Sequence, residues 1–331
     1  MTSITMAPAL EAEAQAFEEQ RPLLFGVAYR MLGSAAEAED IVQDAYLRYR
    51  DVSREEIRNE RSYLVTVVSR LCLDHLKSAR VQRERYVGPW LPEPISTSEA
   101  DWRIAPEGLI DLRESVSMAF LVLLESLGPV ERAVLLLHDV FDYSHAEIAR
   151  ILDRSEAASR QQLKRARERL ATRQKRFAPA DEEQRRLTLQ FVAAAASGDL
   201  AGLLDLLTED AMGYSDGGGK VAAATKVIEG RDRITKLVGG FSRKEQVDRF
   251  ELVEVNGQPA IAAWRSDRLT NVILLGFHGE HVSAFYIQRN PDKLRRLSRA
   301  LGRPSSESQP EPGSEPPAQA TPEKRGTEPR A

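Results

Sequence analysis

A row of cations near the middle of the chain has the residue types and the spacing needed to bind a phosphate backbone. Ten Lys or Arg residues fall between Arg150 and Arg176, against three acidic residues. Three of them recur at i, i+4 and i+7 and so share one face of a helix: Arg160, Lys164 and Arg167. Apolar residues recur on another face: Leu163, Ala166 and Leu170. A helix with one basic and one apolar face suits the major groove of DNA.

A second helix must position this basic helix. Ile148, Ile151 and Leu152 form an apolar helical stripe that Asp153 interrupts, and Ser155 then supplies an N-cap. The segment Tyr143–Arg169 is therefore predicted to be a helix-turn-helix. A solvated amphipathic helix is the alternative, and the short turn between two capped helices favours DNA contact. Asp153 stands where many such motifs have glycine, but Asp tolerates a left-handed backbone better than most residues.

Two further helices carry charge in the N-terminal part. Ser34 is predicted to cap a helix, with Glu37 at capping-box spacing. The outward side chains of this helix are acidic. An acidic face is either solvated or docks onto a basic partner. The helix predicted over 62–85 begins apolar and ends cationic, which suits phosphate binding, and its Tyr63 could stack on an unpaired base.

Composition limits the broad class of protein. A chain of 331 residues with 42% apolar residues, 29% charged residues and a net charge of −4 is an ordinary soluble mixture of two or three domains. Its one cysteine, Cys72, lies in an apolar helical run and is expected to be a buried small hydrophobe in a reducing compartment. No membrane span or export signal is recognisable, so the cytoplasm is the expected location.

Changes in pattern divide the chain. Helical periodicity from about residue 12 to 85 gives way to a proline-rich linker over 86–106, and helices return over 109–177. One or two helices with a break at Gly198 occupy 181–207. Strands are then predicted at Gln246–Val255, Pro259–Trp264, Asn271–Phe277 and Val282–Gln288, with hairpin turns at Asn256-Gly257 and His278-Gly279. The pattern predicts a separate α+β domain, followed by a proline-rich tail that should be disordered.

The order of these segments resembles bacterial sigma factors of the extracytoplasmic-function type. GSAAEAEDIVQDAYLR resembles the region 2 helix that grips core RNA polymerase, SYLVTVVSRLCLDHLKSARVQRER the part that opens and reads the minus-ten element, and LGPVERAVLLLHDVFDYSHAEIARILDRSEAASRQQLKRARERL region 4, which reads the minus-thirty-five element. The resemblance implies that Asp40, Gln43 and Asp44 meet the beta and beta-prime subunits of core RNA polymerase. It implies that melted promoter DNA lies near Asn59, Lys77, Arg80 and Arg83. It implies that the upstream duplex lies near Ser159, Arg160, Lys164 and Arg165.

The remainder resembles the subgroup usually called ECF41, which has a fused C-terminal SnoaL-like domain. Three signatures carry this: WLPEP at Trp90–Pro94, DGGGK at Asp216–Lys220 and NPDKL at Asn290–Leu294. The implied domains are sigma region 2 (12–86), a flexible linker (87–108), sigma region 4 (109–177), an α+β SnoaL/NTF2-like cone (181–301) and a disordered tail (302–331). The resemblance implies regulation in cis, with no dedicated anti-sigma factor.

We expect the signatures to hold the two sigma domains in a particular arrangement, through Trp90, Leu91, Pro92, Asp216, Gly217, Gly218, Gly219, Lys220, Asn290, Pro291, Asp292, Lys293 and Leu294. DGGGK by itself also fits an anion cradle or a flexible loop. NPDKL by itself fits a capped terminal helix.

Catalysis is not expected from the C-terminal domain. Its polar candidates for a cavity are Tyr214, Asp216, His278 and His281, and nothing in the sequence brings them together. HGEH reads as a surface turn, and a two-histidine metal site lacks further ligands. No cofactor and no metal are predicted, although the cone leaves room for an unidentified small ligand. The alternatives are a helix-turn-helix regulator with a ligand-sensing cone and, less favoured, a SnoaL-like enzyme.

Overall fold

The computed structural model describes residues 6–53, 57–83, 86–97, 114–171, 180–244 and 247–302. Side chains within 6–12, 79–83 and 240–244 are outside that description. No helix among the described residues is long and apolar enough to span a membrane. The tail from residue 303 onward, for which disorder is predicted, is not among the described residues.

Three helices form a first helical group: α1 (Met6–Leu32), α2 (Ala35–Arg50) and α3 (Glu60–Arg83). The break between α1 and α2 falls at Gly33, whose φ of +70° is a left-handed conformation that favours glycine. Ser34 then caps α2 by accepting a hydrogen bond from the Glu37 amide, as the sequence predicts. Cys72 is fully buried, also as predicted.

A second helical group follows the linker. It consists of η3 (Glu114–Val116), α4 (Met118–Leu124), α5 (Pro129–Leu135), the π-helical turn η4 (Leu136–Val140), α6 (His145–Leu152) and α7 (Glu156–Ala171). Buried side chains from both helical groups belong to one continuous hydrophobic core, which runs from Phe17 to Leu170. The two groups are therefore packed on each other rather than separated by solvent.

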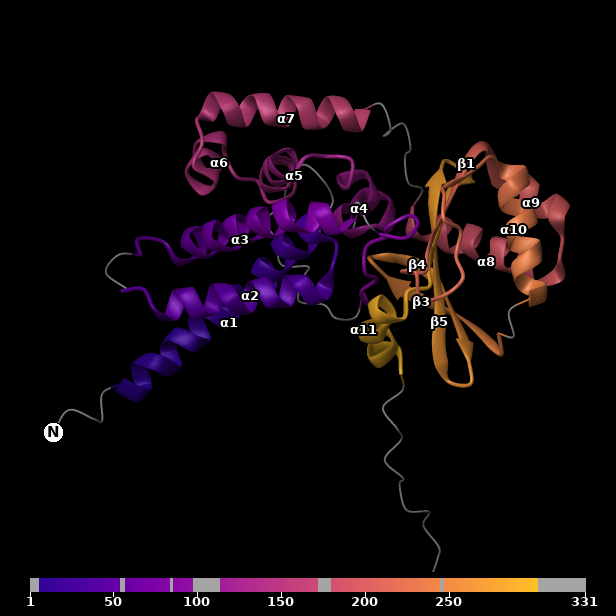
Figure 1. Ribbon diagram of the computed structural model, residues 1–331, viewed down its shortest axis with the longest axis horizontal. Helices are drawn as coiled ribbons and strands as arrows, with labels where there is room; N and C mark the ends of the chain where they lie inside the picture. The colour runs from indigo at the N-terminus through magenta and orange to yellow at the C-terminus, as the bar shows by residue number, and fades with distance from the viewer. Residues whose placement is uncertain are drawn as a thin grey trace, which may run out of the picture. The chain divides into compact units, whose positions relative to one another are not determined.

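The C-terminal part is an α+β domain. Helices α8 (Asp181–Ser197) and α9 (Leu200–Leu206), separated at Gly198 as predicted, precede β1 (Leu207–Asp216), β2 (Ile228–Glu229) and α10 (Arg231–Lys244). The strands β3 (Arg249–Val255), β4 (Gln258–Arg265), β5 (Arg268–His278) and β6 (His281–Gln288) and the helix α11 (Pro291–Leu301) complete it. The sheet has the order β2-β1-β6-β5-β4-β3, and β1–β6 is its parallel pair. Figure 1 shows α8, α9 and α10 on one side of the sheet and α11 on the other.

The four predicted strands correspond to β3–β6, and Asn256-Gly257 forms the predicted β3–β4 turn with φ of +54° and +71°. Two consecutive positive φ values are those of a type I′ turn, for which Asn-Gly is the favoured pair. The sequence prediction missed β1 and β2. β1 carries Asp and Glu in its middle and lacks a clean alternation, so periodicity gave no signal there.

Side-chain alternation gives the sheet two different faces. One face packs on α8, α9 and α10 through residues that include Ile261, Ile273 and Phe285. The other face packs on α11, on α4 of the second helical group and on Leu91 of the linker. The C-terminal sheet thus forms part of a core shared with the second helical group and the linker.

The described part of the linker, residues 86–97, is more tightly packed than the flexible linker that its composition predicts. Residues 91–97 are all buried, and Ser96 forms an antiparallel bridge with Val255 of the edge strand β3. Proline and small polar residues here prevent a regular helix or strand, but they do not prevent burial between other elements.

Candidate interdomain cluster and nucleic-acid interface

The helix-turn-helix forms as the sequence predicts. Ser144 and Glu147 make a capping box at the start of α6, and Asp153 ends that helix with φ +51° and ψ +59°, a left-handed conformation. Arg154 then leads into α7, whose buried face is formed by Leu163, Ala166 and Leu170, together with Ser159. A tight turn followed by a helix anchored along one face leaves the opposite face of α7 available.

The cations of α7 fall into two sets. Arg160, Lys164 and Arg165 are exposed. Their ion pairs to described residues are with neighbours on the same helix, Arg160–Glu156 at 2.9 Å and Lys164–Glu168 at 3.9 Å. Exposed pairs of this kind are weak, so phosphates can compete for these side chains.

Arg167 and Arg169 instead bind buried carboxylates of the preceding helices. Arg167 reaches Asp139 at 2.6 Å, which raises the pKa of the guanidinium, and Arg169 reaches Glu131 at 2.6 Å. Both acids are more than 90% buried. These two cations therefore attach α7 to its own domain, which differs from the expectation that Arg167 belongs to an open basic face.

Ser159 is also placed differently from a base-reading side chain. It is only 1% exposed, and its hydroxyl lies 2.9 Å from Nδ1 of His145. Burial, together with the nearby His138 ring and the cations Arg160 and Arg167, lowers the pKa of His145. The neutral imidazole is thereby favoured, and its bond to Ser159 joins the first turns of α6 and α7.

The acidic face of α2 is open. Asp40, Gln43 and Asp44 are exposed, and Leu47 next to them is 42% exposed. The opposite side of α2 is buried through Ile41, Val42 and Ala45. The structure thus brings the three residues expected to meet polymerase onto one solvent-facing surface with an apolar contact beside them.

The four residues expected near melted DNA are less uniform. Asn59 is exposed, but its side chain accepts a hydrogen bond from the Ser62 amide at 2.8 Å and so caps α3. Lys77 is exposed and pairs with Asp74 at 2.8 Å. Arg80 and Arg83 belong to α3, and their side chains are not among those that the structure describes.

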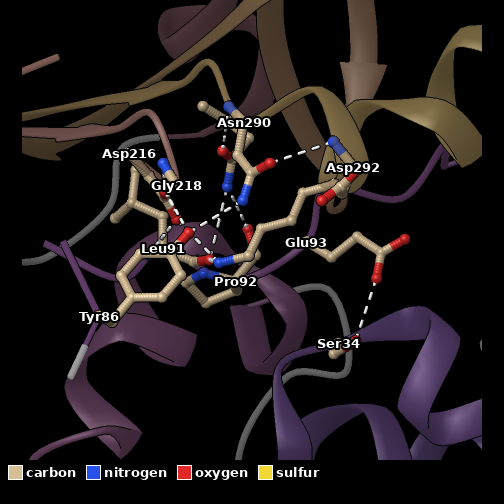
Figure 2. A network of polar contacts seen from close by, with 11 residues as sticks. Ser34, Tyr86, Leu91, Pro92, Glu93, Asp216, Gly218, Asn290 and Asp292 are labelled. Carbon is tan, nitrogen blue, oxygen red and sulfur yellow. Dashed lines mark hydrogen bonds and ion pairs between the residues drawn. The ribbon is translucent and has the colours of Figure 1, made fainter. Parts of the chain in front are cut away.

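The three signatures of the linker and the C-terminal domain meet around one carboxylate, Asp216 (Figure 2). Asp216 is completely buried at the end of β1 and accepts hydrogen bonds from the hydroxyl of Tyr86 at 2.6 Å and from the amide of Leu91 at 2.9 Å. Lys293 of α11 lies 2.8 Å from the same carboxylate. We call Tyr86, Trp90, Leu91, Asp216, Asn290 and Lys293 the Asp216 cluster.

Lys293 connects the cluster to the linker backbone and to two rings. Its ammonium group donates to the carbonyl of Leu91 at 2.6 Å and lies 4.0 Å from the centre of the Trp90 ring and 5.0 Å from that of Tyr86. A desolvated cation over aromatic faces is favourable, more so with a buried counter-charge. Burial and the bond to Asp216 raise the pKa of the Tyr86 phenol.

The remaining signature residues support this centre. Asn290 donates to the Tyr86 hydroxyl at 2.9 Å and accepts from the Asp292 amide at 3.0 Å, next to Pro291, which begins α11. Gly218 has a φ of +61°, and a side chain there would collide with Asn290 at 2.3 Å. Lys220 forms an exposed ion pair with Asp292, which lowers the pKa of that carboxyl.

Two glycines of the signatures lie close to other residues: Gly217 packs against the backbone of Val221, and Gly219 lies beside Val87. Pro92 and Leu294 are buried, Leu294 in the core under the sheet.

Glu93, a carboxylate within the WLPEP signature that was not among its expected contact residues, reaches the first helical group. Glu93 accepts hydrogen bonds from Ser34 Oγ and from the amides of Ala35 and Ala36, at 2.9–3.2 Å, and so covers the N-terminus of α2. Burial raises the pKa of this carboxyl, and the three hydrogen bonds act in the opposite direction. A negative charge at a helix N-terminus is favourable. The WLPEP signature contains Glu93, but nothing in it indicates that the partner is the N-terminus of α2.

The turn residue Asn256 joins four segments. It is fully buried, and its side-chain amide donates to the Tyr29 hydroxyl of α1 at 2.6 Å and to the Val116 carbonyl of η3 at 2.9 Å. Its side-chain oxygen accepts from the amide of Ile95 in the linker at 3.1 Å. The sequence identified Asn256 as a turn residue. The partners in all three of these side-chain hydrogen bonds are 140 or more residues away, so spacing could not reveal them.

The two helical groups also contact each other directly. Arg70 of α3 donates to the carbonyl of Ile151 at 2.9 Å and to that of Arg150 at 3.2 Å, near the end of α6. Arg132 of α5 donates to the carbonyl of Met31 at 2.7 Å. Arginine at these positions satisfies carbonyl groups at helix ends that have no intrahelical partner.

The polar residues proposed for a cavity do not converge. Asp216 belongs to the linker-facing cluster, and Tyr214 stacks on Tyr286 with ring centres 5.2 Å apart on the same face. His278 and His281 are exposed at the β5–β6 turn, the surface position that their sequence context predicts.

Comparisons with known proteins agree with this architecture. The family models for sigma-70 region 2 and for sigma-70 region 4 match residues 16–81 and 117–170, which are the two helical groups. Together, these two matches define a promoter-recognition protein of the sigma-70 class. The extracytoplasmic-function (ECF) RNA polymerase sigma factor SigJ of Mycobacterium tuberculosis (strain ATCC 25618 / H37Rv) is 35% identical over 297 residues, covering 85% of this chain and 93% of SigJ.

A second relative and a solved structure extend the match across the C-terminal domain. The probable ECF sigma factor SigI of M. tuberculosis (strain CDC 1551 / Oshkosh) is 32% identical over 292 residues, covering 87% of this chain and 96% of SigI. The crystal structure of M. tuberculosis SigJ superposes with a TM-score of 0.68, at 32% identity, covering 85% of this chain and 98% of SigJ. This chain belongs to the ECF RNA polymerase sigma factors. As a sigma factor it binds RNA polymerase and directs transcription initiation at promoters.

Proposed function

We propose that the C-terminal domain of this sigma factor keeps regions 2 and 4 in a closed arrangement and so regulates initiation in cis. In this proposal Asp40, Gln43 and Asp44 bind core polymerase, the end of α3 contacts the melted minus-ten element, and the exposed cations of α7 contact the minus-thirty-five element. The linker is the segment that must be released before both elements are engaged.

One contact carries the proposal. Arg70 of α3 lies 2.9 Å from the Ile151 carbonyl of α6, so the two DNA-reading parts touch. Elements centred about 25 base pairs apart, as their names say, are separated by roughly 85 Å along a duplex. A 16-residue helix such as α7 is about 24 Å long, so it cannot bridge that distance from α3. Regions 2 and 4 must therefore move apart to contact both elements at once.

The polar contacts of the linker support a role for the C-terminal domain in preventing that movement. Glu93 is bound to α2, Asp216 and Lys293 hold the backbone of Leu91, and Asn256 joins the linker to α1 and η3. Separation of regions 2 and 4 would break contacts in each of these three places. Because the inhibitory domain is fused, this mode of control does not require a dedicated anti-sigma factor.

A distance measurement tests the proposal. The exposed positions Asp51, at the end of α2, and Ala171, at the end of α7, accept a fluorophore pair as D51C and A171C. Native Cys72 is buried and its thiol pKa is raised, so it should remain unlabelled. We expect energy transfer to be high in the free chain and to fall when core polymerase and promoter DNA are added together. Equal transfer in the free and promoter-bound states would refute the closed-arrangement proposal.

A binding assay separates this proposal from the alternatives. We expect full-length protein to compete with a housekeeping sigma factor for core polymerase, and Asp216→Ala to compete more strongly and to raise promoter output. An unchanged Asp216→Ala variant would argue against regulation through this cluster. An enzymatic role is not supported, because Tyr214, Asp216, His278 and His281 do not form one site. The protein is proposed to act in the cytoplasm, with polymerase, and the C-terminal domain is proposed to accept a small ligand.

A further inference from the structure

The C-terminal domain contains a cavity on the face of the sheet opposite the Asp216 cluster. Its volume is about 190 Å³, and it lies between β4–β6 and the helices α8 and α10. Its walls include Phe191, Val192, Ala195, Leu237, Ile273 and Phe285. Phe250 of the edge strand β3 also lines it and is 46% exposed, so the cavity reaches the surface at that edge.

The chemistry of the walls restricts what the cavity can hold. Among the described residues, every side chain that lines it is aliphatic or a phenyl ring, and none of these is ionisable or able to form a hydrogen bond. A charged or strongly polar guest would lose hydrogen bonds to water that these side chains cannot replace. A neutral apolar guest loses little and restores the dispersion contacts that wall atoms lack beside a void.

The volume restricts the size of the guest. An apolar cavity of about 150 Å³ in another protein stays dry and binds benzene. A cavity of about 190 Å³ is slightly larger and so suits a molecule of one or two fused rings, or a short branched hydrocarbon.

We propose that this cavity is a binding site for a neutral, apolar molecule of one or two rings. The inference deepens the proposed function, since it names the chemical class of the small ligand that the C-terminal domain would accept. Its position makes it suitable as an input to regulation. Ile287 lines the cavity, and the next residue on β6, Gln288, donates to the carbonyls of Leu91 and Pro92 in the linker.

Indole is a suitable probe, because it is neutral, bicyclic and soluble enough for calorimetry. We expect full-length protein to bind indole saturably with one site per chain. We expect the anionic analogue indole-3-acetate to bind at least tenfold more weakly, because none of the described side chains that line the cavity carries a positive charge. Equal affinity for the two compounds, or no saturable binding of indole, would overturn the proposal.

A matched pair of variants on α8 locates the site. Ala195→Phe places a ring in the cavity and should weaken indole binding at least tenfold while raising the melting temperature of the free protein. Ala193→Phe adds the same ring at an exposed position of the same helix that does not line the cavity, and should leave the affinity unchanged. Equal affinities of the two variants would place the site elsewhere and contradict the proposal.

Crystals of the wild-type protein give a test that does not depend on any variant folding. After soaking with 5-bromoindole, an anomalous bromine peak is expected between α8, α10 and β4–β6. A peak only at another position would refute the assignment. The effects of Asp216→Ala on polymerase binding are measured without indole, so failure of the closed-arrangement proposal and failure of the ligand proposal give different results.

Discussion

The two faces of the C-terminal sheet use the same strands for opposite purposes. The face toward α8 and α10 lines a cavity with aliphatic and phenyl side chains among the described residues, whereas the face toward the linker combines apolar packing with buried polar groups such as Asp216, Gln288 and Asn290. Successive residues of a strand point to opposite faces, so Ile287 and Gln288 can serve the two faces independently. The sheet thus separates an apolar face, which packs on helices around the cavity, from a face with buried polar groups, which binds the linker.

Buried polar groups add specificity more than stability. Desolvating Asp216 and Lys293 costs free energy that their attraction only partly offsets, and the favourable outcome depends on all of their partners being in place. Such an arrangement accepts the linker in one position only. The apolar face tolerates small changes of shape, because its contacts have no direction.

Removing the central carboxylate should have the largest effect on linker docking. Asp216→Ala leaves the largely buried Lys293 without its counter-charge, and breaking a buried pair in this way costs about 3–5 kcal/mol. We expect the labelled D51C/A171C protein to show reduced energy transfer without polymerase. Asp292→Ala is the control, since its pair with Lys220 is exposed on both sides and worth about 0–1 kcal/mol. Similar effects of the two variants would contradict the contrast between buried and exposed polar contacts.

Asn256→Gly should have the next largest effect. Glycine keeps the left-handed turn but removes three side-chain hydrogen bonds in a fully buried site, which should cost about 2–3 kcal/mol. The measurement is again energy transfer in the labelled chain, combined with urea unfolding. Ser266→Gly, at the positive-φ turn between β4 and β5, is the matched control and should be neutral or slightly stabilising. A stable, closed N256G protein would show that the hairpin tip is not needed to hold the helical groups.

Tyr86 should make the docking of the linker on the C-terminal domain depend on pH in the alkaline range. The phenol donates to Asp216, and its pKa is raised above the unperturbed value of about 10. A raised pKa in the docked state means that the stabilisation by Tyr86 is complete below about pH 10 and is lost as the pH rises through the docked value. We expect closure of the wild type to weaken above about pH 10. In Tyr86→Phe, closure should be less favourable by about 1–2 kcal/mol at neutral pH and should lack that pH dependence. An identical alkaline profile in Y86F would assign the effect to another group.

A change on the apolar face should have the smallest effect and a different signature. Ile273→Val deletes one methylene group next to the cavity and should lower the unfolding free energy by about 1 kcal/mol. Because Ile273 does not touch the linker, energy transfer at room temperature should remain that of the wild type. A fall in transfer would show that the two faces are coupled more tightly than their separate side chains suggest.

Much of the fold could be predicted from local sequence. The helix-turn-helix follows from its caps and apolar stripe, β3–β6 follow from strand patterns, and Gly198 and Asn256-Gly257 mark breaks that the structure contains. Each of these signals lies within a few residues of the element that it specifies. β1 and β2 could not be found in this way, because β1 is defined by its pairing with β6, about 75 residues later, rather than by its own alternation.

The candidate site was predictable where a motif marked it. DGGGK, NPDKL and WLPEP identified Asp216, Asn290, Lys293 and the linker. The contacts of Tyr86, Glu93 and Arg70 could not be predicted, because their partners are 57 to 130 residues away. The burial of the linker was hidden as well, because its composition matches that of a solvated segment. Sequence patterns report the local conformation that a residue favours, whereas these contacts depend on how helices and strands pack together in the tertiary structure.

The covalent connection between α7 and α8 has a consequence for where the C-terminal domain can be during initiation. α7 ends at Ala171 and α8 begins at Asp181, ten residue steps later, and a fully extended chain of that length reaches roughly 35 Å. In the proposed released state, this covalent connection would keep the C-terminal domain within that distance of region 4 and of the promoter DNA bound there. The domain would therefore travel with the initiation complex at a high local concentration and could close again without diffusing from solution.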